Sequence, residues 1–119
     1  MTMPTLDEIK AISLSLRARA DDRPDWLKAM PHACEPTALY YRLFYELSRS
    51  FQPQAVLEIG TYVGTSAAHF AAGCRKATVV TIDHNPDAAR RVEDLGLANM
   101  FAVTRNSSSA YGDPGVKAR

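Results

Sequence analysis

The chain has 119 residues, of which 46% are hydrophobic and 23% are charged, and its formal net charge is +1. This composition is ordinary for a soluble globular protein and argues against a disordered chain, and the lack of a basic excess argues against a nucleic-acid-binding surface. The length predicts one domain, residues 1–119, that buries about two thirds of the surface its unfolded form exposes.

The first 52 residues are expected to form a helical leader. Thr5 and Glu8 have the spacing of a capping box, in which each side chain bonds the backbone N–H of the other residue. Apolar residues at helical spacing follow, and Pro53 stops the last helix. The expected helical segments are residues 5–20, 24–30 and 39–51.

From residue 53 onward, short apolar runs alternate with helical segments. The expected order is strand 56–59, helix 65–75, strand 78–82, helix 86–95 ended by Gly96, and strand 101–104. Short connections imply parallel strands with right-handed crossovers. The sequence thus predicts an α/β fold, a Rossmann-like three-layer sandwich whose truncated parallel sheet has the strand order 3-2-1, and an irregular tail at residues 108–119.

A strand followed by a two-glycine turn is the most informative feature of the chain. Val56 to Ile59 is the strand, Gly60 and Gly64 belong to the turn, and Asp83 ends the next strand. Glycines let a ligand approach the backbone, free N–H groups at the helix start face its polar groups, and an acid at a strand end accepts hydrogen bonds from a ribose. The pattern predicts a site for a nucleotide-type cofactor.

Two phosphate-binding motifs do not fit this turn. The G-x-x-x-x-G-K-[ST] motif requires a wider glycine spacing and a lysine, whereas Thr65 follows Gly64. In the G-x-G-x-x-G motif the second and third glycine positions are here Tyr62 and Ala67, so a pyrophosphate would meet a bulkier turn.

The acid-x-Gly-x-x-x-Gly arrangement from Glu58 to Gly64 resembles the class I S-adenosylmethionine-dependent methyltransferases. Residues 58–67 are similar to the small-molecule O-methyltransferases related to catechol O-methyltransferase, which tolerate an aromatic residue between the glycines. The resemblance covers residues 53–107, with the leader as a looser match. It implies S-adenosylmethionine as cofactor and methyl transfer to a hydroxyl of a small-molecule acceptor. The family sheet has seven strands, and this chain offers candidates for three, so a partial or truncated form is expected.

The cofactor's charges account for the residue types at the turn. Glu58 is suited to its ammonium group, and the turn N–H groups with the Ser66 hydroxyl suit its carboxylate. By the resemblance, Asp83 accepts from the ribose, His84 borders the adenine, and Asn106 stands where the family has an acid contacting the adenine amine. The predicted cofactor-binding residues are Glu58, Gly60, Thr61, Tyr62, Gly64, Ser66, Asp83, His84, Asn106 and Ser107. No catalytic residue and no metal ligand is assigned.

Structural roles are alternatives for several of these residues. Glu58 is also interpretable as a strand-end carboxylate, and Asp83 as the cap of the next helix. His69 is expected to be a partly buried structural residue, and Arg90 with Arg91 a solvated helix face. The aromatic cluster of the leader is expected to be core or interface; it comprises Tyr40, Tyr41, Phe44 and Tyr45.

Localisation signals are absent from the sequence. The N-terminus has neither the basic nor the apolar region of a signal peptide, and no segment approaches the roughly 18 uninterrupted apolar residues of a membrane span. Cys34 and Cys74 form neither a C-x-x-C motif nor a secreted disulfide pattern. We therefore expect a cytoplasmic protein without a membrane or nucleic-acid partner.

The expected strand order leaves the strand at Val56 to Ile59 on an open edge of the sheet. Open edges favour association, so a homodimer, a partner chain or a longer gene product is expected to cover it. A partial methyltransferase is the leading function. The alternatives are a catalytically silent cofactor-binding or assembly module that needs a partner chain and, resting only on shared Rossmann topology, an NAD-dependent oxidoreductase.

Overall fold

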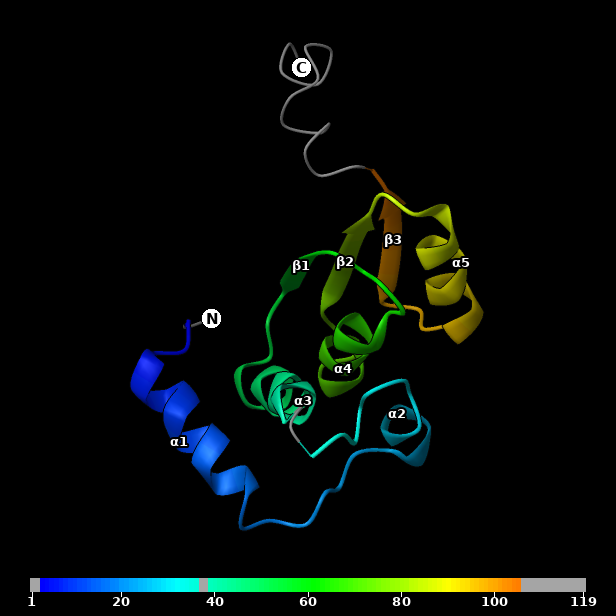
Figure 1. The fold of residues 1–119 in the computed structure, drawn as a ribbon. Helices are drawn as coiled ribbons and strands as arrows, with labels where there is room; N and C mark the ends of the chain where they lie inside the picture. Colours follow the sequence, from blue (N-terminus) through cyan, green and yellow to red (C-terminus); the bar gives the residue numbers. More distant parts are fainter. Residues whose placement is uncertain (1–2, 37–38, 106–119) are drawn as a thin grey trace.

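The computed structural model describes residues 3–36 and 39–105, which form a helical leader followed by an alternating α/β unit (Figure 1). Every strand and helix expected after residue 53 is present, and each of its ends agrees with the expected bound or differs from it by one or two residues. The elements are α1 (Leu6–Leu16), α2 (Asp25–Lys28), α3 (Tyr40–Phe51), β1 (Ala55–Ile59), α4 (Thr65–Gly73), β2 (Thr78–Asp83), α5 (Pro86–Leu95) and β3 (Met100–Thr104).

The three strands form one parallel sheet in the order β1-β2-β3. This is the predicted 3-2-1 order, and the predicted Rossmann-like α/β class with a truncated sheet is confirmed. Within the described residues, β1 pairs only with β2 and lies at the sheet edge. The register sets Glu58 of β1 opposite Thr81 of β2, and Thr81 opposite Ala102 of β3. Because paired residues share a face, these three side chains point to the same side of the sheet.

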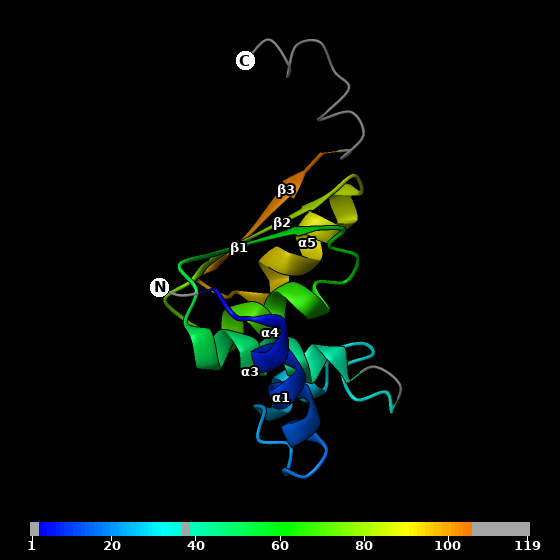
Figure 2. The same ribbon diagram turned by 90° about the vertical axis from the view of Figure 1, so that its left-hand side faces the viewer.

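One face of the sheet carries the helices. Figure 2 shows α4 and α5 gathered on the same side, and the core between them and the strands contains Val79, Met100, Ala67, Ala68, Ala71 and Val92. The residues that alternate with the core positions of the strands face the other way. Leu57 is 66% exposed and Phe101 52% exposed, and Ile59 and Val103 are also exposed. The described residues therefore supply the sheet and one helical layer, and they leave an apolar sheet face in contact with solvent.

The leader begins with the predicted capping box. The Thr5 hydroxyl accepts from the Glu8 N–H at 3.1 Å, and the Thr5 N–H donates to the Glu8 carboxylate at 3.0 Å. The first helix ends at Leu16 rather than near Ala20, which corrects the predicted boundary. The reason is tertiary: the buried guanidinium of Arg42 donates to the carbonyls of Leu16, Arg19 and Ala20, which satisfies them without a further helical turn.

Helix α3 crosses α4 at close range and thereby places α4 on the sheet. The Ser48 hydroxyl donates to the Phe70 carbonyl at 2.7 Å, and the rings of Phe44 and Phe70 stack at 4.7 Å between centroids. A Cβ atom on Gly73 would lie 2.5 Å from the Tyr45 carbonyl oxygen, so only glycine fits at this crossing. None of the described helices is long and apolar enough to cross a membrane.

Candidate functional site

The turn between β1 and α4 is held in a conformation that favours glycine. Gly60 and Gly64 have φ angles of 95° and 85°, and Tyr62 between them has φ 51°. The Gly60 N–H donates to the Ile82 carbonyl at 2.7 Å, and the Gly64 N–H donates to the Thr61 carbonyl at 2.9 Å. A Cβ atom on Gly60 would meet none of the described atoms within 4 Å. The left-handed backbone at Gly60 therefore borders open space that a ligand is able to enter.

Asp83, at the end of β2, anchors this turn from the neighbouring strand. Its carboxylate accepts from the Tyr62 N–H and from the Asn85 N–H, each at 2.9 Å. These backbone donors, that of Asn85 first, lower the pKa of Asp83. The carboxylate is therefore ionised at neutral pH, and its remaining lone pairs are free to accept hydroxyl groups.

Asp83 is not the N-cap residue of α5, which was its alternative role. Asn85 occupies the N-cap position, and its side chain accepts from the Asp87 N–H at 2.9 Å. Asp83 lies two residues earlier, so its carboxylate serves the turn and the segment that leads to the helix.

Glu58, at the end of β1, lies on the helical side of the sheet and is half-buried. The Thr81 hydroxyl donates to its carboxylate at 2.8 Å. Burial raises the pKa of Glu58, and the hydroxyls of Thr81 and Ser66 act in the opposite direction. Glu58 is thus a partly desolvated carboxylate beside the glycine turn, whose charge an approaching cation would stabilise.

The first turn of α4 has free backbone donors. Gly64 is its N-cap residue, and none of the described side chains caps this end. Helix N-termini carry unsatisfied N–H groups and a partial positive charge, which suit a carboxylate or another anion. Ser66 lies in this turn, whereas the Thr65 hydroxyl is already used and donates to the Pro31 carbonyl at 2.9 Å.

A cavity of about 130 Å³ opens where β1 and β2 end. Asp83 and His84 line it together with Ile59, Gly60, Ile82 and Arg105. Ligands of open parallel sheets bind beyond the carboxyl ends of the strands, and this cavity occupies that position.

Buried polar residues hold the leader against α4 behind the turn. Arg23 is bound by Asp21 and donates through Nη1 to the Ala33 carbonyl and to His69 Nε2, both at 2.9 Å. His69 is fully buried, and its Nδ1 bonds the Thr65 carbonyl at 2.7 Å. Burial first, and then the charge of Arg23, lower the pKa of His69 to about 4. His69 therefore has the predicted structural role, with a deeper burial than expected.

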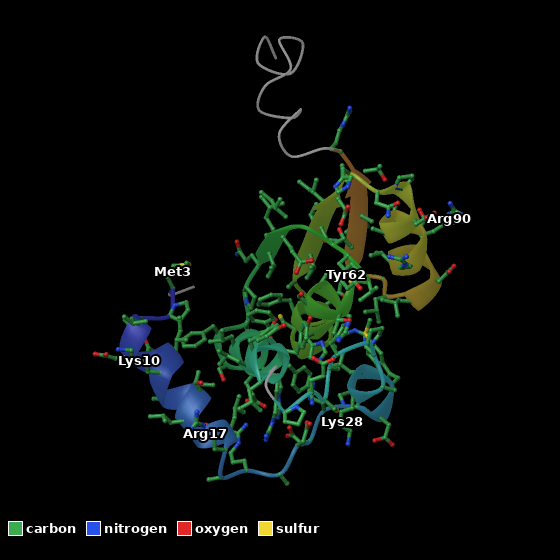
Figure 3. The ribbon with its side chains drawn as sticks, in the orientation of Figure 1. Met3, Lys10, Arg17, Lys28, Tyr62 and Arg90 are labelled. Atoms are coloured by element: carbon green, nitrogen blue, oxygen red, sulfur yellow. The ribbon has the colours of Figure 1, made fainter. Side chains whose placement is uncertain are left out.

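Most of the predicted cofactor-binding residues meet at this site. Gly60, Asp83 and His84 line the cavity, and Gly64 and Ser66 belong to the adjoining start of α4, where the Ser66 side chain bonds Glu58. Tyr62 is 64% exposed at the rim of the turn (Figure 3), and its ring stacks against His32 with centroids 6.4 Å apart. The Thr61 hydroxyl, in contrast, is buried against Thr81, so only its backbone borders the turn. Asn106 and Ser107 lie outside the described residues.

Two contributors to the site have no motif in the sequence. Thr81 was predicted only as part of a strand, and the signal for its role is a hydroxyl residue directly opposite an acid in the parallel register. Arg91 is exposed on the helix face, as predicted, and in addition its guanidinium donates to the Tyr62 carbonyl at 3.1 Å and supports the strained turn. Arg90 matches the prediction, because it is exposed and pairs with Asp87 on its own helix.

Solved structures of methyltransferases share this fold. A methyltransferase of Podospora anserina with bound S-adenosylhomocysteine aligns with a TM-score of 0.61 and 21% identity, over 93% of this chain and 55% of its own. A putative caffeoyl-CoA O-methyltransferase of Staphylococcus aureus aligns with a TM-score of 0.58 and 18% identity, over 92% of this chain and 56% of its own. The O-methyltransferase TomG of Streptomyces achromogenes, in complex with S-adenosylmethionine, aligns with a TM-score of 0.58 and 20% identity, over 95% of this chain and 58% of its own. The chain thus has a methyltransferase fold and spans a little more than half the length of these proteins.

A partial match at the level of sequence agrees with the fold. Residues 57–114 match the family described as a methyltransferase domain, and the match begins in β1 and includes the glycine turn. A comparison with curated protein sequences gave no significant match. The predicted resemblance to methyltransferases is confirmed at the level of the fold and, in the sequence, over residues 57–114.

Proposed function

We propose that this chain binds S-adenosylmethionine at the ends of β1 and β2 and serves methyl transfer to a hydroxyl of a small molecule. The observation that carries the proposal is the pair of carboxylates on adjacent strands, Glu58 and Asp83, on either side of a glycine turn that borders open space. The resemblance of residues 57–114 to a methyltransferase domain supports it.

The charges of the site match those of the cofactor. S-Adenosylmethionine carries an ammonium group, a carboxylate and a sulfonium, and it has no phosphate. In the proposed complex, Glu58 holds the ammonium group, the α4 N-terminus and Ser66 hold the carboxylate, and Asp83 accepts from the ribose. His84 lines the same cavity and would border the adenine.

The bound cofactor would supply an activated methyl group, since a sulfonium is already a good leaving group. The remaining task of a methyltransferase is to align the acceptor and, for a hydroxyl, to remove its proton. We assign no described residue to this second task. The proposed contribution of this chain is therefore to bind and orient the cofactor.

Isothermal titration with S-adenosylmethionine and S-adenosylhomocysteine tests the proposal. We expect both ligands to bind the wild-type chain, and Asp83→Asn to weaken binding by about tenfold or more through loss of a charge-assisted hydrogen bond. Asp94→Asn is the matched control, because Asp94 is an exposed acid of α5 away from the cavity. Absence of heat with both ligands for a folded sample would refute cofactor binding.

Titration together with a methyl-transfer assay separates the alternative functions. A catalytically silent module binds S-adenosylmethionine but transfers no methyl group by itself, whether a partner chain completes the activity or the activity is lost. An NAD-dependent oxidoreductase would bind NAD, and the proposal requires that the wild-type chain shows no affinity for NAD.

We also propose that a second copy or a partner chain covers the β1 edge and the adjacent apolar sheet face. The support is the exposure of Leu57, Ile59, Phe101 and Val103 on one face beside an unpaired strand. Size-exclusion chromatography with light scattering is expected to show association that Leu57→Glu weakens. Leu14→Glu is the matched control, since Leu14 on α1 is equally exposed at 66%. A well-behaved wild-type monomer would contradict the proposal.

A further inference from the structure

Thr81 links the acid of the turn to the core of the sheet. Its side chain is completely buried and lies directly opposite Glu58 in the parallel register. Its hydroxyl donates to the Glu58 Oε1 at 2.8 Å. An ionised carboxylate only accepts hydrogen bonds, so the single hydroxyl proton of Thr81 is directed at Glu58.

A second hydroxyl completes this arrangement from the other side. Thr61 is buried in the glycine turn, and its Oγ1 lies 2.6 Å from the Oγ1 of Thr81. Because Thr81 donates to Glu58, Thr61 donates to Thr81. The proton order is therefore Thr61 to Thr81 to Glu58, and successive hydrogen bonds of this kind strengthen one another in a buried setting.

The carboxylate needs this support because burial works against its charge. Desolvation raises the pKa of Glu58, whereas a hydrogen bond donated to the ionised form lowers it. In the ligand-free chain, Ser66 of α4 is the other hydroxyl that lowers this pKa. The titratable neighbour on α3 is Tyr41, whose pKa is raised to about 12, first by burial and then by Tyr40, Glu35 and Glu58. Among the described residues, hydroxyl groups rather than cations hold Glu58 in its ionised form.

We propose that Thr81 is a positioning residue of the cofactor site, which keeps the Glu58 carboxylate ionised and turned toward the glycine turn. One oxygen is held by Thr81, and the remaining lone pairs are left for the ammonium group of the cofactor. This inference rests on the proposed function. It assigns Thr81 no contact with the cofactor, and its effect passes through Glu58.

A purely structural role makes a different prediction. If the two threonine hydroxyls only satisfy each other in the core, then loss of the Thr81 hydroxyl would lower stability and leave the ionisation of Glu58 unchanged. The measurement must therefore follow the carboxyl group itself.

The test compares Thr81→Val, which keeps the shape and removes the hydroxyl, with Thr81→Ser, which keeps the hydroxyl. Thr78→Val is the matched control on the same strand, because Thr78 is exposed and faces the opposite side of the sheet. The pKa of the Glu58 side chain is measured by carbon-13 NMR in the ligand-free chain. We expect Thr81→Val to raise this pKa by roughly half to one pH unit, as the loss of one hydrogen bond implies. Thr81→Ser and Thr78→Val should keep the wild-type value.

Titration with S-adenosylhomocysteine at several pH values then tests the effect on binding. We expect Thr81→Val to weaken binding about fivefold at neutral pH and to move the acid limit of binding upward with the pKa of Glu58. An unchanged Glu58 pKa in folded Thr81→Val overturns the inference whatever the ligand does. A different result is possible, in which Thr81→Val raises the pKa of Glu58 but the wild-type chain binds no S-adenosylhomocysteine. That result overturns the proposed function. It also refutes the cofactor role of Thr81, which is then a positioning residue for Glu58 alone.

Discussion

Acid pH should destabilise this fold through His69. Its Nδ1 bonds a carbonyl, which only accepts, and its Nε2 faces a guanidinium, which only donates. The buried ring is therefore neutral, with the proton on Nδ1, and a second proton would place two N–H groups against each other. Burial, together with the facing charge of Arg23, explains why the pKa of His69 is lowered to about 4.

The sign and size of the effect follow from linkage. The unfolded chain binds the proton near pH 6.5, and the folded chain binds it only near pH 4. The stability contributed by neutral His69 is thus fully present above pH 6.5 and is lost as the pH falls toward 4. Each pH unit in this window corresponds to about 1.4 kcal/mol, so the loss is on the order of 3 kcal/mol. A domain of this size has a total stability of roughly 5–15 kcal/mol, so the change is measurable.

The assay is urea unfolding followed by circular dichroism between pH 7 and pH 4. The contribution of Asp21 persists through this window, because Arg23 lowers its pKa to about 2. The raised pKa of Glu58 acts in the opposite direction, so variants are compared with wild type at each pH. His69→Gln should flatten the profile, whereas His84→Gln, at an exposed position, should not. Parallel profiles for wild type and His69→Gln would refute the reasoning.

Three further outcomes test the packing, the site and the leader. Gly73→Ala should lower the free energy of unfolding by about 1–2 kcal/mol, because a Cβ atom 2.5 Å from the Tyr45 carbonyl costs more than the helix propensity that alanine adds; a urea midpoint at or above wild type would contradict this. Glu58→Gln should leave the unfolding free energy at pH 7 unchanged or higher, since burial disfavours its charge, and should weaken S-adenosylhomocysteine binding about tenfold; a large loss of stability in urea unfolding would count against it. Thr5→Ala should lower the free energy of unfolding by about 1 kcal/mol, because it removes the capping box. Ser13→Ala, at an exposed position on the same helix, is the control and should have no effect. Equal urea midpoints for the two variants would contradict the prediction.

Local patterns in the sequence were sufficient to predict the helices and strands of the α/β unit and the position of its glycine turn. Gly60, Gly64 and Gly96 all adopt positive φ angles where a turn or a helix end was predicted. Thr5 and Glu8 form the predicted capping box. These features depend on residues a few positions apart, so their physical causes are contained in short stretches of chain.

Such local patterns could not predict contacts between residues that are distant in the sequence. Helix α1 ends early because Arg42, more than twenty residues later, binds the carbonyl of its last residue, Leu16, and that of Arg19 just beyond it. Arg91 supports Tyr62 across the site, although its exposed position on a helix predicts only solvation. In both cases the partner is set by how helices pack, and no local spacing encodes it.

The sequence alone determined that Glu58 and Asp83 lie near the ends of neighbouring strands on either side of a glycine turn, because the motif spacing is local and right-handed crossovers fix the order of strands joined by short connections. Only the tertiary structure decided what surrounds them. It placed Thr81 opposite Glu58, turned the Thr61 hydroxyl away from the site into the core, and left the far face of the sheet exposed. The reason is physical: ionisation and hydrogen bonding depend on burial and on neighbours in space, and these exist only once the strands have paired and the helices have packed.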